Sequence, residues 1–325
     1  MSSLDTATSP QKLPPRAPRA PRAPRAPRAR RSRGSSPLAG AGMNLLYVPA
    51  LLLFAVFTIY PLVTGAAISF TNWNGYSADR SDVGFANYTR LFQDETFRLV
   101  LINTFIYGFG STIIQQALGL GLALALDQKV RGRNLARAII YLPVLVSPVV
   151  MGTMYYLLFQ YNNGAFNDIV VGLGGERVAW LSDSGAAIAI IVLVNSLQFV
   201  GVSMIIYLAG LQSIPTELYE ASTLDGAGYW KQFWHITLPL LQPAFATSIV
   251  LNLIGGLKLF DVIVVLTGGG PGYSTNSVST LIGVAYFDNQ SAGYASGMGI
   301  VLFLVIVLFT LGLNTLLNRR RLDRA

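Results

Sequence analysis

The side chains best able to do chemistry gather in one polar stretch, Tyr219–Pro239, which reads YEASTLDGAGYWKQFWHITLP. It carries Glu220, Asp225 and Lys231, together with His235, the only histidine of the chain. The chain has no cysteine, so thiolate nucleophiles, disulfides and cysteine metal ligands are excluded. One histidine does not make a metal centre, and nothing points to a Ser/His/Asp arrangement. We therefore expect no catalytic residue and no metal site, and we interpret His235 as a packed or surface residue.

The sequence also lacks the pattern of a nucleotide site. A P-loop needs a glycine directly before its lysine, and none of the four lysines follows a glycine. The glycine-rich stretch TGGGPG, Thr267–Gly272, opens no lysine-bearing helix and is expected to be a turn. We therefore expect this chain to bind no cofactor and to hydrolyse no ATP. A TVGYG filter of the potassium-channel kind is missing as well.

The polar stretch lies between long apolar runs. Hydrophobic residues make up 52% of the 325 residues and charged residues only 12%, with a mean hydropathy of +0.51. A helix needs about 20 apolar residues to cross a bilayer, and we predict an all-α polytopic membrane protein with six transmembrane helices. Pro143 and Pro148 are expected to kink the third of them. The six runs are Leu45–Phe70, Leu99–Leu126, Ala138–Phe159, Gly185–Leu211, Ala244–Leu266 and Tyr294–Leu317.

The basic residues set the expected orientation. Lys and Arg are enriched in cytoplasmic loops, and 18 of the 23 lie on one side of the six predicted spans. Both termini and the loop of residues 210–243 are therefore predicted to be cytoplasmic. We assign residues 1–42 to a disordered Arg/Pro-rich tail, 43–318 to the transmembrane domain and 319–325 to a basic cytoplasmic tail. The PRA repeats of the first tail suit either attraction to anionic lipid or RNA, or a solvated tail that keeps the N-terminus inside.

Five polar residues interrupt the predicted fourth and fifth spans. Asn195 and Gln198 lie in the fourth, and Asn252, Lys258 and Asp261 lie in the fifth. With the spacing i, i+3, Lys258 and Asp261 are expected to share one helix face. Charges inside a membrane line a cavity or pair with one another, so two interpretations are open: a neutralised pair that holds helices together, or a site on a translocation path. Amides and the aromatic residues of the spans would suit a hydroxyl-rich substrate.

The polar stretch itself is predicted to fold as two short helices joined by a turn. Pro215 suits the first turn of a helix, and Glu217 complements its positive end. Gly226 stands where this helix would stop. A second helix fits Tyr229–Ile236, and Pro239 marks its end or a kink. The loop could be an interfacial element on lipid headgroups, but its acidic first helix better suits a basic pocket on a partner protein.

The segment EASTLDGAGYWKQFWHITLP resembles the EAA loop of ABC importer permeases. That pattern is E-A-A, three residues, Gly, nine residues, Ile, any residue and Leu-Pro, and every spacing is kept here. The departure is a serine in place of the second alanine, and its small side chain should preserve close packing. The resemblance implies that the loop couples the chain to an ATPase through Glu220, Ala221, Ser222, Asp225, Gly226, Ile236, Leu238 and Pro239.

Other stretches resemble the sugar-uptake branch of these permeases, the relatives of the maltose and glycerol-phosphate transporters. They include YPLVTGAAISFTNWN, GFANYTRLFQDETFRLVLINTF and LKLFDVIVVLTGGGPGYSTNSVST. The resemblance covers most of Leu45–Arg319 and excludes the Arg/Pro tail. It implies the six-helix fold of a type I ABC importer permease.

The resemblance also implies a half-transporter, multi-pass in the bacterial plasma (inner) membrane. Its partners would be a second, homologous permease, two ATP-binding cassette subunits that hold ATP and Mg²⁺, and an external solute-binding lipoprotein, but no nucleic acid. The substrate would be a sugar, with glycerol 3-phosphate or a related polar solute as the alternative. A secondary transporter that uses an ion gradient and a membrane scaffold with a docking loop are further alternatives.

Overall fold

The computed structural model describes residues 47–128 and 131–322. The predicted N-terminal tail, residues 1–42, lies outside the described residues. The chain divides into two compact units, Met1–Phe54 and Ala55–Ala325. The first contributes one described helix, α2 (Tyr47–Phe54), and the packing below belongs to the second unit.

The regular elements of the described residues are helices, and the extended pairing among them is one isolated bridge between Thr71 and Asp82. Elements marked η are π-helical turns. The first part of the second unit contains η1 (Ala55–Ile59), α3 (Tyr60–Ile68), α4 (Ala86–Gln93), α5 (Glu95–Phe105), η2 (Ile106–Gly110), α6 (Ser111–Asp127), α7 (Arg133–Leu145), α8 (Pro148–Phe159) and α9 (Ala165–Gly172). The second part contains α10 (Ser184–Gln212), α11 (Thr216–Leu224), α12 (Tyr229–Gln232), η3 (Phe233–Thr237), α13 (Leu238–Leu240), α14 (Gln242–Leu257), α15 (Asp261–Leu266), α16 (Val278–Gly283), η4 (Val284–Asp288) and α17 (Ala292–Leu322).

Four of the predicted spans are single helices long and apolar enough to cross a membrane: Tyr47–Ile68, Glu95–Asp127, Ser184–Gln212 and Ala292–Leu317. The other two are helix pairs with a sharp bend, α7 with α8 at 96° and Tyr229–Leu240 with α14 at 63°. The described part of the chain therefore holds six spans if each bent pair counts as one. The all-α membrane fold is confirmed, whereas the cytoplasmic position of both termini stays a prediction.

The bends correct two details of the sequence analysis. In the third span the helix breaks between Leu145 and Pro148, while Pro143 stays inside α7. Pro148 begins α8, where its missing N–H removes no hydrogen bond. The fifth span does not run to Leu266, because α14 ends at Leu257 and the chain is irregular before α15. The kink expected at Pro148 is confirmed, whereas the apolar pattern did not reveal the break between α14 and α15.

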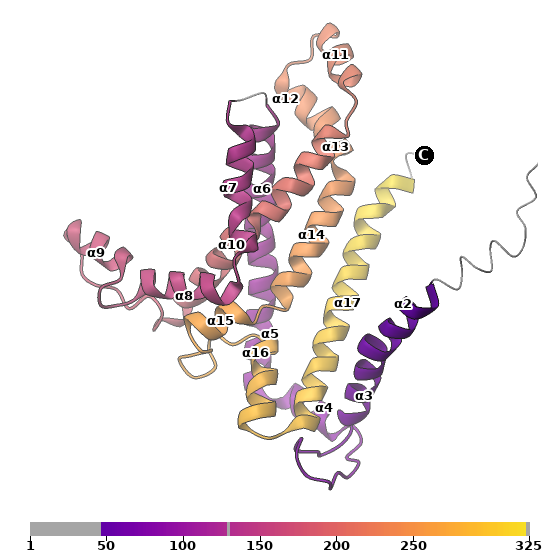
Figure 1. The fold of residues 1–325 in the computed structure, drawn as a ribbon, viewed down its shortest axis with the longest axis vertical. Helices are drawn as coiled ribbons and strands as arrows, with labels where there is room; N and C mark the ends of the chain where they lie inside the picture. Colours follow the sequence, from indigo (N-terminus) through magenta and orange to yellow (C-terminus); the bar gives the residue numbers. More distant parts are fainter. Residues whose placement is uncertain (1–46, 129–130, 323–325) are drawn as a thin grey trace, which may run out of the picture. The chain divides into compact units, whose positions relative to one another are not determined.

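The long helix α10 is the centre of the packing. It contacts α6, α7 and α14, and α14 in turn lies beside α17, which also packs on α3, α4 and α16 (Figure 1). Between spans in lipid, association depends on close packing and on hydrogen bonds rather than on burial from water. Small residues are therefore expected at the closest crossings.

Two glycines occupy such crossings. A Cβ on Gly119 of α6 would lie 2.5 Å from Ser203 Cβ of α10. A Cβ on Gly256 of α14 would lie 2.8 Å from Gly108 Cα and 3.0 Å from Tyr107 O, both backbone atoms of η2. These contacts leave no room for a side chain, so glycine sets how closely the backbones approach.

The loop after α15 is tied to the helices by polar side chains. Asn103 Nδ2 donates to Ser274 O at 2.7 Å, and Tyr107 OH donates to Thr275 O at 2.8 Å. The segment Thr267–Gly272 is a turn, as predicted, with three of its glycines at positive φ. Hydrogen bonds between segments distant in sequence thus hold this loop against α5 and η2.

Asp94 connects α5 to α17. Its carboxylate caps α5 by accepting hydrogen bonds from the N–H groups of Thr96 and Phe97, and it accepts another from Tyr294 OH at 2.8 Å. Partial burial opposes ionisation of Asp94, but these donors outweigh it, so the pKa of Asp94 lies below its ordinary value of 3.8. The contact therefore stabilises the folded chain above about pH 4 and is lost as the pH falls further.

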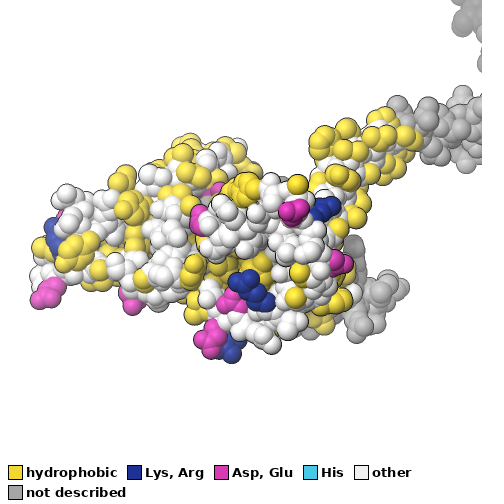
Figure 2. Space-filling view, turned by 90° about the horizontal axis from the view of Figure 1, so that it is seen from below, with side chains coloured by type: hydrophobic (Ala, Val, Ile, Leu, Met, Phe, Trp, Pro, Cys, Tyr) yellow, Lys and Arg dark blue, Asp and Glu magenta, His cyan; other side chains and the backbone are white. Residues whose placement is uncertain are grey.

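The end of the molecule where α4 and α16 lie carries scattered charges. Figure 2 views this end directly and shows acidic and basic side chains, some of them next to one another, among polar and apolar ones and without a large basic patch. The assignment of this end to the outer side of the membrane stays a prediction.

The crossing at Gly256 yields a stability prediction. We expect Gly256→Ala to destabilise the chain by about 1–3 kcal/mol, because the new methyl group would press on backbone atoms that cannot turn away. Gly255→Ala is the matched control, since its Cβ would meet nothing within 4 Å and alanine favours the helix by up to about 1 kcal/mol. Thermal unfolding of the detergent-solubilised protein measures both. Equal melting temperatures would show that the crossing is not tight.

Candidate functional site

The EAA-like loop, residues 210–243, begins with an exposed acidic helix. Helix α11 starts at Thr216, and Pro215 precedes it as the N-cap rather than lying in its first turn. Glu217 lies in the first turn, as predicted, and Glu220 is exposed on the same helix. No residue of α11 is buried, and Leu224 at its end is 90% exposed. The helix therefore presents a surface that little of the described chain covers.

The turn after α11 depends on glycine. Gly226 has φ +76°, and the N–H groups of Gly226 and Ala227 donate to the carbonyl oxygens of Thr223 and Ser222 at 3.0 and 2.9 Å. This pair of bonds is a Schellman motif, which ends a helix through a left-handed residue. A Cβ on Gly226 would meet nothing within 4 Å, so the backbone conformation alone requires glycine here. The predicted end of the first helix is confirmed.

The second half of the loop folds back and bonds to the first. Gln232 Nε2 donates to Ser222 Oγ at 3.0 Å and to Thr223 Oγ1 at 2.9 Å. The hydroxyls of Tyr219 and Thr237 lie 2.9 Å apart and form a further bond. The serine that departs from the EAA pattern thus accepts a hydrogen bond that alanine could not accept.

The predicted second helix extends further than Ile236. Elements α12, η3 and α13 form one helical segment, Tyr229–Leu240, and Pro239 lies inside it rather than ending it. The 63° bend into α14 follows at Leu241. Ile236 and Tyr219 pack against a core that includes Tyr207 and Leu241, while Leu238 and Pro239 are half-buried. The end of the loop is therefore anchored to α10 and to the start of α14.

The charged side chains of the loop have no ion partner among the described residues. The ion pair that the described part of the chain does contain joins Arg177 and Asp168 at 3.4 Å, far from the loop in sequence. Glu220 and Asp225 are exposed, and His235 is exposed with its Nδ1 2.9 Å from Lys231 O. No group of three metal-ligating side chains occurs in the described residues.

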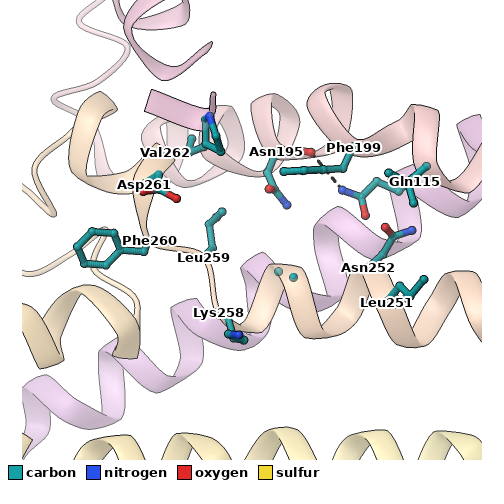
Figure 3. Close-up of a pocket in the computed structure, with 14 residues that line it drawn as sticks. Gln115, Asn195, Phe199, Leu251, Asn252, Lys258, Leu259, Phe260, Asp261 and Val262 are labelled. Atoms are coloured by element: carbon teal, nitrogen blue, oxygen red, sulfur yellow. Dashed lines mark hydrogen bonds between the residues drawn. The ribbon is translucent and has the colours of Figure 1, made fainter. Parts of the chain in front are cut away.

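A cavity of about 310 Å³ lies between α6, α10, α14 and the break that follows α14 (Figure 3). Four of the five predicted pathway residues line it: Asn195, Asn252, Lys258 and Asp261. The fifth, Gln198, does not, because its Nε2 donates at 3.1 Å to Val146 O at the break between α7 and α8. The structure thus brings polar groups from two spans together in one site, and Gln198 lies outside this site.

The prediction that Lys258 and Asp261 share one helix face is wrong. Lys258 caps the end of α14 and Asp261 begins α15, with the irregular residues Leu259 and Phe260 between them. Their side chains form no ion pair, and both residues are exposed to the cavity side (Figure 3). The interpretation as a neutralised pair is therefore not supported by the geometry.

Sequence analysis missed Gln115, which also lines the cavity. Gln115 lies on α6 and is 1% exposed, and its Nε2 donates to Asn195 O on α10 at 3.1 Å. The signal was present, since Gln115 and Gln116 are an amide pair inside an uncharged apolar run. Phe199 and Phe260 add aromatic side chains to the cavity wall.

Comparison with known proteins identifies similar chains. Residues 117–323 match the family described as "Binding-protein-dependent transport system inner membrane component". The trehalose/maltose transport system permease protein MalF of Thermococcus litoralis is 34% identical over 82% of this chain and 90% of its own length. The arabinooligosaccharides transport system permease protein AraP of Bacillus subtilis is 34% identical over 83% of this chain and 87% of its own.

A solved structure has a similar fold. One chain in the crystal structure of a bacterial ABC transporter that imports the acidic polysaccharide alginate superposes with a TM-score of 0.76. The identity is 24%, and the match covers 87% of this chain and 96% of the other. A structure of the bacterial alginate transporter in complex with its alginate pentasaccharide-bound periplasmic protein matches at 25% identity with a TM-score of 0.75.

The Schellman turn yields a prediction for the EAA-like loop. We expect Gly226→Ala to weaken the turn by about 1 kcal/mol, because alanine is strained at positive φ, and to speed exchange of the residue 227 amide roughly fivefold. Gly228→Ala is the matched control, since residue 228 has φ −75° and open space around its Cα. Hydrogen exchange read by mass spectrometry measures both. Unchanged exchange in Gly226→Ala would mean that the turn does not need glycine.

Proposed function

Because the chain belongs to the family of binding-protein-dependent transport system inner membrane components, we propose that it is the permease subunit of an ATP-driven sugar importer. As a member of this family with several apolar helices, it is a multi-pass protein of the inner membrane. The observation that carries the proposal is the central cavity, which gathers amide, charged and aromatic side chains between the spans. Hydroxyl-rich ligands need such a mixture of hydrogen-bonding groups and aromatic surfaces.

The similar proteins support a sugar as the substrate. Two of these relatives are named after sugars, trehalose/maltose and arabinooligosaccharides. Each of the two aligns with more than four-fifths of this chain. The lining of the cavity suits the same class of compound, because amides such as Asn195 and Asn252 can both donate to and accept from hydroxyl groups.

The proposed partners follow from the family and from what the chain lacks. A sequence without a P-loop needs ATP and Mg²⁺ to be held by a separate subunit, and two such ATPases would dock beneath a pair of permeases. A second, homologous permease would complete the pathway, and an external binding protein would deliver the sugar. The exposed acidic surface of α11 suits a basic groove on the ATPase, where Glu220 would pair with a basic residue.

The contacts of the EAA-like loop suggest how motion would reach the cavity. A displaced α11 pulls on the second half of the loop through the bonds from Gln232 and between Tyr219 and Thr237. That half continues through α13 into α14, whose far end carries Asn252 and Lys258 at the cavity. Movement of the ATPases would thus tilt one wall of the site and alternate its access.

The proposed substrate class is tested with the reconstituted complex, including the partner permease, the ATPases and the binding protein. Maltose, trehalose, arabinotriose and glycerol 3-phosphate are added in turn, and ATP hydrolysis is recorded. We expect at least one of the three neutral sugars to stimulate hydrolysis above the ligand-free rate, because ligand delivery and ATP hydrolysis are coupled. Stimulation by none of the sugars would refute the proposal.

The role of Glu220 is tested by charge reversal. Glu220→Lys should reduce co-purification of the ATPase by at least about tenfold, since it would place like charges together at the docking surface. Glu176→Lys makes the same charge change at an exposed residue between α9 and α10 and serves as the control. If the ATPase stays bound to Glu220→Lys as firmly as to the control, the assignment of α11 as the docking helix is wrong.

A further inference from the structure

The cavity contains a buried hydrogen-bond acceptor with no partner. Gln115 Oε1 is enclosed and accepts no hydrogen bond from the described residues. The orientation of the carboxamide is fixed, because Nε2 donates at 3.1 Å to the carbonyl of Asn195 and an exchange of the two atoms would place oxygen against oxygen. Most buried polar atoms are paired, so this oxygen needs a donor that the described chain does not provide.

Two neighbouring amides on the same cavity are also incompletely paired. Asn252 Nδ2 donates to Ser203 Oγ at 2.6 Å, while its Oδ1 accepts no hydrogen bond from the described residues. The Asn195 side chain makes no hydrogen bond to any described residue, although it is only 2% exposed. Figure 3 shows Gln115, Asn195 and Asn252 on the wall of this one cavity. Three spans thus contribute amide groups to a shared space, and of these amides Gln115 has the buried oxygen without a partner among the described residues.

We propose that Gln115 is a specificity-determining residue of the transport site, whose Oε1 accepts a hydrogen bond from a hydroxyl of the ligand and thereby selects a neutral polyhydroxylated ligand over a phosphorylated one. The proposal rests on the proposed function, and it adds α6 to the helices whose side chains would contact the substrate. A hydroxyl can donate to this oxygen, whereas the oxygens of a phosphate dianion can only accept.

The other polar groups of the cavity also favour a neutral ligand over a phosphorylated one. Lys258 and Asp261 contribute one positive and one negative charge, so the cavity has no net charge to attract a phosphate. The unpaired amide oxygen of Gln115 would face the phosphate oxygens with a like partial charge. A phosphomonoester would lose its hydration and meet this acceptor beside the donors of Lys258 and Asn195, while a sugar would pair a hydroxyl with the open acceptor.

Gln198 provides a matched control within the same chain. It too is fully buried, donates its Nε2 to a backbone carbonyl and leaves its Oε1 unpaired. It differs from Gln115 in that it does not line the cavity. If an unpaired glutamine oxygen in this bundle were only a packing feature, the two residues would respond alike to substitution.

The experiment measures direct ligand binding to the complete transporter complex in the absence of the binding protein. The radiolabelled probes are glycerol 3-phosphate and whichever of maltose, trehalose and arabinotriose stimulates ATP hydrolysis most strongly. We expect Gln115→Met to weaken binding of the neutral sugar by about tenfold, the effect of losing one buried hydrogen bond. Gln198→Met also frees the carbonyl of Val146, so binding is counted per assembled complex, and there it should change by less than about threefold because Gln198 does not line the cavity.

The outcomes separate the inference from the proposed function. Equal weakening in Gln115→Met and Gln198→Met, or none in either, would overturn the role of Gln115 while leaving sugar import intact. Tighter binding of glycerol 3-phosphate than of the sugar by the unmodified complex would overturn the selectivity. Failure of every sugar to stimulate hydrolysis would refute the proposed function and the inference together. Should Gln115→Met not assemble, Gln115→Asn withdraws the oxygen by one methylene group and is expected to weaken binding as well.

Discussion

A carbonyl group that leaves a helix inside a membrane must find a new hydrogen-bond donor, because lipid offers none. Besides the 63° bend at Leu241, the described spans break between α7 and α8 and between α14 and α15, and a side chain meets this requirement at each of these two breaks. Gln198 donates to Val146 O between α7 and α8, and Ser277 Oγ donates at 2.7 Å to Leu259 O between α14 and α15. The donors come from segments far away in sequence. The bent helices therefore exist only as parts of the assembled bundle.

The break after α14 also shapes the cavity, because it places Lys258 and Asp261 in or next to an irregular segment that lines this space. The crossing at Gly119 is tight, and Gly256, which also lines the cavity, lies close to the backbone of η2. Helix α14 thus packs closely on η2 and also lines the cavity.

The EAA-like loop and the cavity are mechanically continuous. Its first helix is held by few contacts and ends at a glycine turn, whereas its second helix is anchored in the core and runs into α14. Ser222 strengthens the link between the two halves, because its hydroxyl accepts a hydrogen bond from Gln232. Under the proposed function, a displacement of α11 would thus reach the wall of the cavity that α14 forms.

The sequence by itself determined the membrane class, the approximate limits of the spans and the two-helix form of the EAA-like loop, including its end at Gly226. The length of an apolar run and the positions of proline and glycine are properties of neighbouring residues. The backbone conformations that they indicate are local too. Only the tertiary structure decided that Lys258 and Asp261 lie on either side of a break, that Gln198 serves a distant carbonyl and that Gln115 faces the cavity. A polar residue in a span needs a partner, and that partner is defined by packing between helices rather than by neighbours in the chain.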